Sequence, residues 1–250
     1  MKKLLILLVC FTFITDAFAV RLQYKYEKNK PVFYELVMDS ASSFVSPDSG
    51  KREMKMQTVV KVKQELIEED AEGNMKLAMT IVSAEQTVNG VKKPFPTAAN
   101  QTQIVKMRKN GKVLSALSQM PGQSPDQNAM QMVFPENELK AGDTWTQLKD
   151  IAQPIPVETR TLYKITKING NDVTISSIMK LKNSGGDSVQ AQTKGSTQFD
   201  TEKGRIVQSF ADSKFQFEIP LKVPGLLPNN TNVKVTHHMK INLKEIEGEQ

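Results

Sequence analysis

Apolar and polar residues alternate with a period of two along several long segments of this 250-residue chain. In residues 54–66 the even positions are mostly Met, Val and Leu, and the odd positions are mostly Lys, Gln and Glu. Successive side chains of a β-strand point to opposite faces, so this pattern predicts a strand with one face on a core and the other in water. The other segments that alternate or follow a turn signal are 75–88, 103–109, 112–117, 159–168, 172–181, 195–200, 205–211 and 232–246. We therefore expect a mainly β protein of long antiparallel strands.

Turn signals join these segments into hairpins. Asn110-Gly111 and Asn169-Gly170 are strong two-residue hairpin signals, and residues 70–74 and 202–204 also contain glycine. The glycines lie at similar offsets in the two halves of the chain, which predicts an internal duplication. We expect halves at residues 20–135 and 136–250 that form one continuous domain, with the last strand, 232–246, closing or edging the sheet.

Two segments interrupt the strand pattern. Ser124 and Pro125 suit the start of a helix, and the chain from 124 to 134 predicts one short helix. Residues 220–230 are rich in proline and glycine and predict an irregular loop. A curved sheet with this helix and loop over its apolar face gives a half-barrel or a sandwich.

The N-terminus has the three zones of a secretory signal peptide: Lys2 and Lys3, an apolar run over residues 4–14, and the small-x-small site Ala17-Phe18-Ala19. We expect cleavage near Ala19 and a periplasmic or secreted protein. The apolar run is too short to span a bilayer, and no later stretch approaches that length. An uncleaved anchor and a lipid attached at Cys10 are the alternatives. Cleavage removes the one cysteine, and with it disulfide and thiol chemistry.

The segment Leu139-Lys140-Ala141-Gly142-Asp143-Thr144-Trp145 resembles a Gly-Asp-x-Trp signature of exported bacterial proteins and lipoproteins of unknown function. In those proteins it precedes a strand-rich C-terminal half, as it does here. The layout of long antiparallel strands also resembles the half-barrel lipoprotein carriers of the LolA and LppX/LprG-like group. That resemblance implies a lipid-binding half-barrel, but no carrier motif transfers binding residues. From its residues alone, the segment predicts a turn at Gly142-Asp143, followed by a strand in which Trp145 fills the core.

Enzyme signatures are missing: there is no nucleophile elbow, phosphate-binding glycine loop or His-Glu-x-x-His motif. His237 and His238 are adjacent on one strand, so their rings point to opposite faces and cannot share a metal. His237 lies in an apolar row and is interpreted as a core or cavity-lining residue. The Met-x-Met spacings at 54–56 and 130–132 are compatible with copper(I), but Met is also a flexible filler of apolar pockets. We expect no enzyme, no cofactor and no metal.

The apolar face of the sheet is the remaining candidate for function. Incomplete cover would leave an apolar cavity for a lipid or another hydrophobic ligand. The residues predicted to line it are Met54, Met56, Val60, Met79, Met130, Phe134 and Leu226. The alternative is a structural or protein-interaction module of the envelope with a packed core, and a composition of 39% hydrophobic and 6% aromatic residues is compatible with both.

The net charge and the spacing of the basic residues indicate which partners the protein can have. The chain has a net charge of +6, and its Lys and Arg residues alternate with apolar residues instead of clustering. This spacing favours a solvated sheet face, with attraction to an anionic membrane surface or a polyanion as the alternative. We expect no nucleic acid partner, and a hydrophobic ligand or an envelope protein instead.

Overall fold

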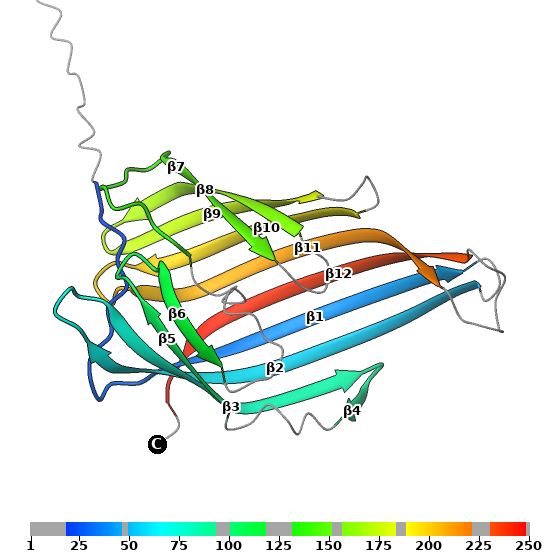
Figure 1. Ribbon diagram of the computed structural model, residues 1–250, viewed down its shortest axis with the longest axis horizontal. Coiled ribbons are helices and arrows are strands. Elements are labelled where there is room, and N and C mark those ends of the chain that lie inside the picture. Colours follow the sequence, from blue (N-terminus) through cyan, green and yellow to red (C-terminus); the bar gives the residue numbers. More distant parts are fainter. Residues whose placement is uncertain are drawn as a thin grey trace, which may run out of the picture.

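The computed structural model describes residues 19–46, 50–93, 101–118, 132–151, 157–183, 189–221 and 231–248. Figure 1 shows long, twisted strands that lie side by side across the molecule. The strands are β1 (Val32–Ser46), β2 (Gly50–Glu69), β3 (Met75–Val88), β4 (Val91–Lys93), β5 (Thr102–Met107), β6 (Val113–Ser118), β7 (Thr144–Ile151), β8 (Val157–Asn169), β9 (Asp172–Asn183), β10 (Val189–Asp200), β11 (Arg205–Leu221) and β12 (Thr231–Ile246).

All of these strands belong to one antiparallel sheet, which confirms the predicted fold class and excludes the two-sheet sandwich. The order is β6-β5-β3-β2-β1-β12-β11-β10-β9-β8-β7, with the short β4 beside β3. The sheet is open, because β6 and β7 form its two edges. The four predicted hairpins are present as β2–β3, β5–β6, β8–β9 and β10–β11. The internal duplication stays a prediction.

The position of β12 corrects one expectation. The last strand was expected to close or edge the sheet, but it lies at the centre, between β1 and β11. Phe33 of β1 is opposite Ile246 of β12, so strands from the two ends of the chain are neighbours. In Figure 1 the blue β1 and the red β12 lie next to each other in the middle of the sheet. This pairing joins the two halves of the chain.

The segment before β1 crosses one end of the curved sheet. The Tyr24 N–H donates to Lys109 O (2.7 Å), in the turn between β5 and β6, and the Lys25 N–H donates to Gly204 O (2.8 Å), in the turn between β10 and β11. These turns belong to opposite halves of the sheet order. Since consecutive residues bind both, the sheet must curl to bring them together. We call this end proximal and the opposite end distal.

The proximal end contains the main core. Tyr24 and Phe134 stack with ring centroids 5.3 Å apart, and Phe199 packs edge-on against both rings. Around them are buried side chains from strands of both halves, including Leu36, Val62, Leu77, Val105, Ile165, Val173, Ile175 and Leu243. The core is therefore shared by the whole sheet.

The Gly-Asp-x-Trp segment has the predicted structural role. Gly142 lies in a turn with φ of 96°, and its N–H donates to Ile165 O at 2.8 Å. Trp145 lies at the start of β7, where its indole stacks on Tyr163 and its Nε1–H donates to Val133 O at 3.0 Å. The motif thus holds the start of β7 against β8.

Some predictions fall outside the described residues. These are the signal peptide apart from Ala19, most of the loop 220–230, and the predicted helix 124–134 apart from its last three residues. Met132, Val133 and Phe134 are not helical. The described part of the chain contains no helix, and hence none of the length and apolarity that a membrane span requires.

Candidate ligand-binding surface on the inner face

The sheet has two chemically different faces. The face that carries the core, which we call the inner face, receives the even positions of β1 and β2 from Val32 to Phe44 and from Met54 to Gln64. The β1–β2 pairing has no bulge between Val32 and Ser46, and the β1–β12 pairing has none either. The inner face therefore continues without interruption from the packed proximal end to the distal end.

Among the described residues, the void in the proximal core is too small for a ligand. The void among Tyr24, Tyr26, Tyr34, Val62, Gln64, Ile206 and Leu243 has a volume of about 20 Å³. That volume holds roughly one water molecule. Tyr26 fills part of the polar side of this void by donating a hydrogen bond from its hydroxyl to Gln64 Oε1 (2.8 Å). The candidate site on the inner face is therefore the part of the sheet farther along the strands.

Beyond the core, four neighbouring strands present a mostly apolar surface that is partly buried, with Val233 and Val235 of β12 on the same face only 6% and 3% exposed. We call it the distal inner surface and define it as Ser40, Ser42, Phe44, Met54, Met56, Phe215, His237 and Met239. Its most exposed member is Met54, at 37%. Unbranched thioether side chains adapt to irregular apolar partners. The surface thus combines adaptable apolar groups with incomplete burial.

One polar pair lies within this surface. The Ser42 Oγ and His237 Nδ1 atoms are hydrogen-bonded at 2.8 Å, and the His237 ring lies 5.9 Å from the ring of Phe215. Burial lowers the pKa of His237 below its ordinary value of 6.5, and the neighbouring His238 lowers it further. His237 is therefore a neutral imidazole at pH 7, able to exchange a hydrogen bond with a polar ligand group.

His238 lies on the outer face, as strand geometry requires. Its Nε2 is 2.8 Å from Asp212 Oδ1, and the hydrogen bond with His238 lowers the pKa of Asp212. The two histidines thus have separate partners on opposite faces. Among the described residues there is no group of three or more His, Cys, Asp or Glu side chains placed to hold a metal ion.

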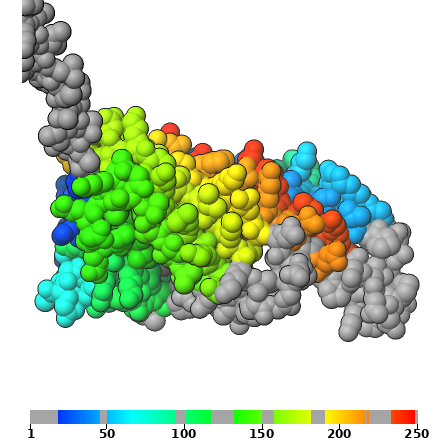
Figure 2. Space-filling view, turned by 90° about the horizontal axis from the view of Figure 1, so that it is seen from above, coloured from blue at the N-terminus to red at the C-terminus, as the bar shows by residue number. Residues whose placement is uncertain are grey.

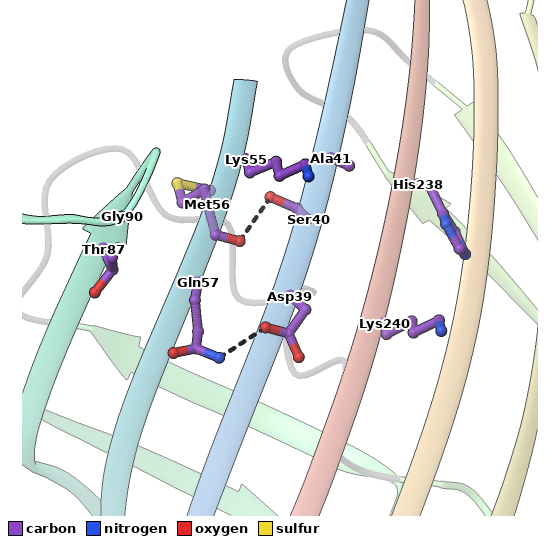
Figure 3. Close-up of a pocket in the computed structure, with 10 residues that line it drawn as sticks. All are labelled: Asp39, Ser40, Ala41, Lys55, Met56, Gln57, Thr87, Gly90, His238 and Lys240. Carbon is purple, nitrogen blue, oxygen red and sulfur yellow. Dashed lines mark hydrogen bonds between the residues drawn. The ribbon is translucent and has the colours of Figure 1, made fainter. Parts of the chain in front are cut away.

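A groove of about 310 Å³ crosses the outer face from β3 to β12. Figure 3 shows its lining, in which the Gln57 Nε2–H donates to Asp39 Oδ1 (2.8 Å) and the Ser40 Oγ–H donates to Met56 O (3.4 Å). Lys55, Lys240 and His238 contribute to its rim. Ala41, Met56 and Gly90 line the groove together with these charged and polar residues, so the groove has a mixed character.

The predicted lining residues separate into three groups. Met54 and Met56 lie on the distal inner surface, as described above. Val60 and Met79 also lie on the inner face, but Val60 is buried in the core and Met79 packs against it. Phe134 is a core residue at 2% exposure. Met130 and Leu226 lie outside the described residues.

Sequence reasoning missed several members of the surface. Met239 is opposite Ser40, and Phe215 is opposite His237. The alternation in residues 232–246 places Met239 and His237 on one face, which is a signal that could have identified Met239. Phe215 has a similar signal, because Phe215, Phe217 and Ile219 alternate with Lys214, Gln216 and Glu218. The sequence does not show that Phe215 lies opposite His237, which depends on the pairing of β11 with β12.

Comparison with known proteins adds one partial family match. Residues 126–219 match the model of a family of unknown function, DUF6263. The match covers less than half of the chain and contains the Gly-Asp-x-Trp segment. No curated protein matches the sequence.

Among solved structures, one from a study of lipid–protein interactions in lipovitellin has a TM-score of 0.53 at 11% identity. The similarity covers 90% of this chain and 26% of the lipovitellin chain, so this protein spans about a quarter of that structure. At this identity the likeness concerns the fold alone.

Two further structures have lower scores. DynF from the dynemicin pathway of Micromonospora chersina has a TM-score of 0.23 at 8% identity, over 92% of this chain and 86% of its own. A LolA superfamily protein from Nitrosomonas europaea has a TM-score of 0.16 at 10% identity, over 91% of this chain and 90% of its own. Scores this low carry no argument about fold or function.

Proposed function

We propose that this protein binds a lipid or another elongated hydrophobic ligand on its distal inner surface, after export from the cytoplasm. The observation that carries the proposal is the unbroken register of β1 with β2 and β12. It extends the apolar face beyond the packed core, where Met54, Met56 and Met239 are only partly buried. An apolar surface of this kind gains free energy when a ligand removes it from water.

The His237–Ser42 pair suits an amphipathic ligand. With Ser40, the pair makes up the polar part of a mostly apolar surface. His237 lies opposite Phe215, and Ser42 is next to Met239, which is opposite Ser40. Binding sites for small molecules combine apolar walls with a few placed polar groups. A ligand with an acyl chain and a hydrogen-bonding head would satisfy both parts. The lipovitellin likeness supports the proposal at the level of fold, since that structure is described for its lipid–protein interactions.

The first experiment is to purify the protein natively from its host, extract it with organic solvent and analyse the extract by mass spectrometry. The proposal expects a stoichiometric lipid, together with saturable binding of a fluorescent fatty acid by the delipidated protein. If no lipid is extracted and the probe does not respond, the proposal is wrong and the structural or interaction module is favoured.

A matched pair of variants places the site. Met54 and Val45 are both exposed apolar residues near the distal end, at 37% and 45%, but Met54 lies on the inner face and Val45 on the outer face. Met54→Glu puts a charge on the proposed surface and should weaken probe binding at least about tenfold. Val45→Glu should leave binding unchanged. Equal effects of the two variants would contradict the inner-face assignment.

A further inference from the structure

Three exposed aliphatic side chains gather on the outer face near the edge of the sheet. Leu162 of β8 lies directly opposite Ile178 of β9, and Leu148 of β7 is one cross-strand row away, opposite Arg160. Their exposures are 62% for Leu148, 45% for Leu162 and 41% for Ile178. In the space-filling view of Figure 2, the strands of the second half, coloured green to orange, lie side by side. Exposed aliphatic groups that lie together on one face are a candidate interaction surface.

Four cations surround this cluster. Arg160 is opposite Leu148, Lys164 is two residues from Leu162, Lys180 is two residues from Ile178, and Lys194 is opposite Ile178. All four side chains are exposed. None of them forms an ion pair with another residue that the structure describes, whereas Lys63, Lys106 and Lys109 on the first half are each paired with a carboxylate. We call the three aliphatic and four basic residues the basic apolar patch.

We propose that the basic apolar patch binds the surface of a lipid bilayer that contains anionic lipids. The unpaired cations complement the negative surface potential of such a bilayer, and the aliphatic groups can insert between its head groups. The patch includes Leu148 of β7, which is an edge strand among the described strands, so no further described strand obstructs its approach to a flat surface. This inference does not depend on the proposed ligand on the inner face.

The composition of the patch argues against two other partners. A symmetric dimer through this surface would bring two copies of the same positively charged surface together, which is repulsive. Single-stranded nucleic acid is bound through aromatic side chains that stack on bases, and the three apolar members of the patch are aliphatic.

The test is co-flotation of the purified full chain with vesicles. The protein should float with vesicles of phosphatidylglycerol and phosphatidylcholine, should stay at the bottom with pure phosphatidylcholine, and should be released as the salt concentration rises. Equal flotation with both vesicle types, or none with either, would overturn the proposal.

Paired variants locate the contact. The double variants Arg160→Glu with Lys180→Glu, and Leu148→Ser with Leu162→Ser, should each reduce the floating fraction at least about tenfold. Lys76→Glu with Lys112→Glu makes the same charge change at exposed residues of the first half, and Val91→Ser with Leu114→Ser makes the same apolar change. These controls should float like the wild type.

Two further readouts separate this proposal from its alternatives. The patch variants should still bind the fluorescent fatty acid, because the patch and the distal inner surface lie on opposite faces. If the controls lose flotation as strongly as the patch variants, binding is due to net charge and the patch assignment is wrong. If the wild type is a dimer in solution that the Leu148 and Leu162 changes dissociate, the patch is an interface between copies instead.

Discussion

The hydroxyl group of Tyr24 makes two hydrogen bonds with the backbone of Met132: it donates to the carbonyl oxygen (3.2 Å) and accepts from the N–H group (3.1 Å). Both residues are buried. Through this contact the segment before β1 is attached to the segment before β7, and both are attached to the core by Phe134. The proximal end of the sheet is thus held together by residues that belong to no strand.

Tyr24→Phe keeps the ring contacts with Phe134 and Phe199 but leaves the Met132 carbonyl and amide groups without a partner. We expect the free energy of unfolding to fall by about 1–3 kcal/mol. Denaturant unfolding followed by the fluorescence of Trp145, the one tryptophan, measures this loss. Tyr163→Phe is the control, because its hydroxyl donates a longer bond (3.3 Å) to the half-buried Gln147. A larger effect at Tyr163 would contradict the proposed importance of the Tyr24 contact.

High pH should destabilise the fold through the buried tyrosines. Burial raises the pKa of Tyr24, Tyr26 and Tyr34 above the ordinary value of 10.0. The unfolded chain loses these protons first, so the contribution of these tyrosines to stability is constant below pH 10 and falls as the pH rises beyond it. Tyr34→Phe should make this decline less steep. The free energy of unfolding, measured below and above pH 10, checks this slope. If the tyrosines of the folded protein ionise near pH 10, as seen in the absorbance of tyrosinate, their pKa is not raised and the prediction is wrong.

Gly111 and Gly142 provide a matched test of close packing. Both have positive φ, of 91° and 96°. A Cβ atom at Gly111 would lie 2.3 Å from Met132 O and 2.7 Å from Tyr24 Cε2, whereas one at Gly142 would have no neighbour within 4 Å. Alanine at either position costs about 1–2 kcal/mol of backbone strain, and at Gly111 the clash adds about 1–3 kcal/mol. Unfolding free energies of the two variants should differ by this second amount, and equal losses would contradict it.

Low pH should act through Asp70, in the turn between β2 and β3. Hydrogen bonds from Lys106 and from the side chain and backbone of Asn74 hold the pKa of Asp70 well below its ordinary value of 3.8. Because the pKa of Asp70 is lower in the folded protein than in the unfolded chain, the charged Asp70 stabilises the fold above pH 3.8. This stabilisation is lost as the pH falls below 3.8. Asp70→Asn should therefore lower the melting temperature by a few degrees at neutral pH, as expected for a surface ion pair, and the difference should vanish in acid. A difference that persists in acid would show that the charge is not its cause.

Hydrogen exchange should follow the position of each strand in the sheet. The central strands β1 and β12 each have partners on both sides, whereas β6 pairs only with β5 and β7 only with β8 among the described strands. Amides of β1 and β12 should exchange slowest and those of β6 and β7 fastest, measured by mass spectrometry of proteolytic fragments. Greatest protection at either edge would indicate a partner bound to that edge.

The hairpins could be predicted from the sequence because each is local. Asn169-Gly170 sets the turn between β8 and β9, and the alternation on both sides sets which residues are buried. The turn at Asp70–Asn74 is local in the same way, since Asp70 accepts hydrogen bonds from the Glu72 and Asn74 amides. Information of this kind lies within a few residues.

The central position of β12 could not be predicted in this way. Residues 232–246 have the same pattern at the centre of a sheet as at its edge, since period two reports on faces and not on neighbours. The helix expected at 124–134 fails at its described end for a related reason. Phe134 donates its N–H to Asn110 O (2.8 Å) and places its ring in the core, and these distant contacts outweigh local helix preference.

The candidate site was predicted in part for the same physical reason. Alternation predicted that Met54 and Met56 lie on the apolar face of the sheet. The pairing of β1 with β2 confirms that they lie on this face. Alternation could not distinguish a core position such as Val60 from a half-buried one such as Met56, because both have the same phase. The two positions differ only in where they lie along β2, since the packed core ends between them.

The pairing of β1 with β12 also imposes an order of assembly. Each hairpin can form as soon as its own residues are available, but β1 acquires its second neighbour only when the last strand is present. A chain that lacks its final residues would expose a long unpaired edge at what should be the middle of the sheet. Completion of the sheet therefore waits for β12, and until it pairs the apolar face is divided between two separate groups of strands.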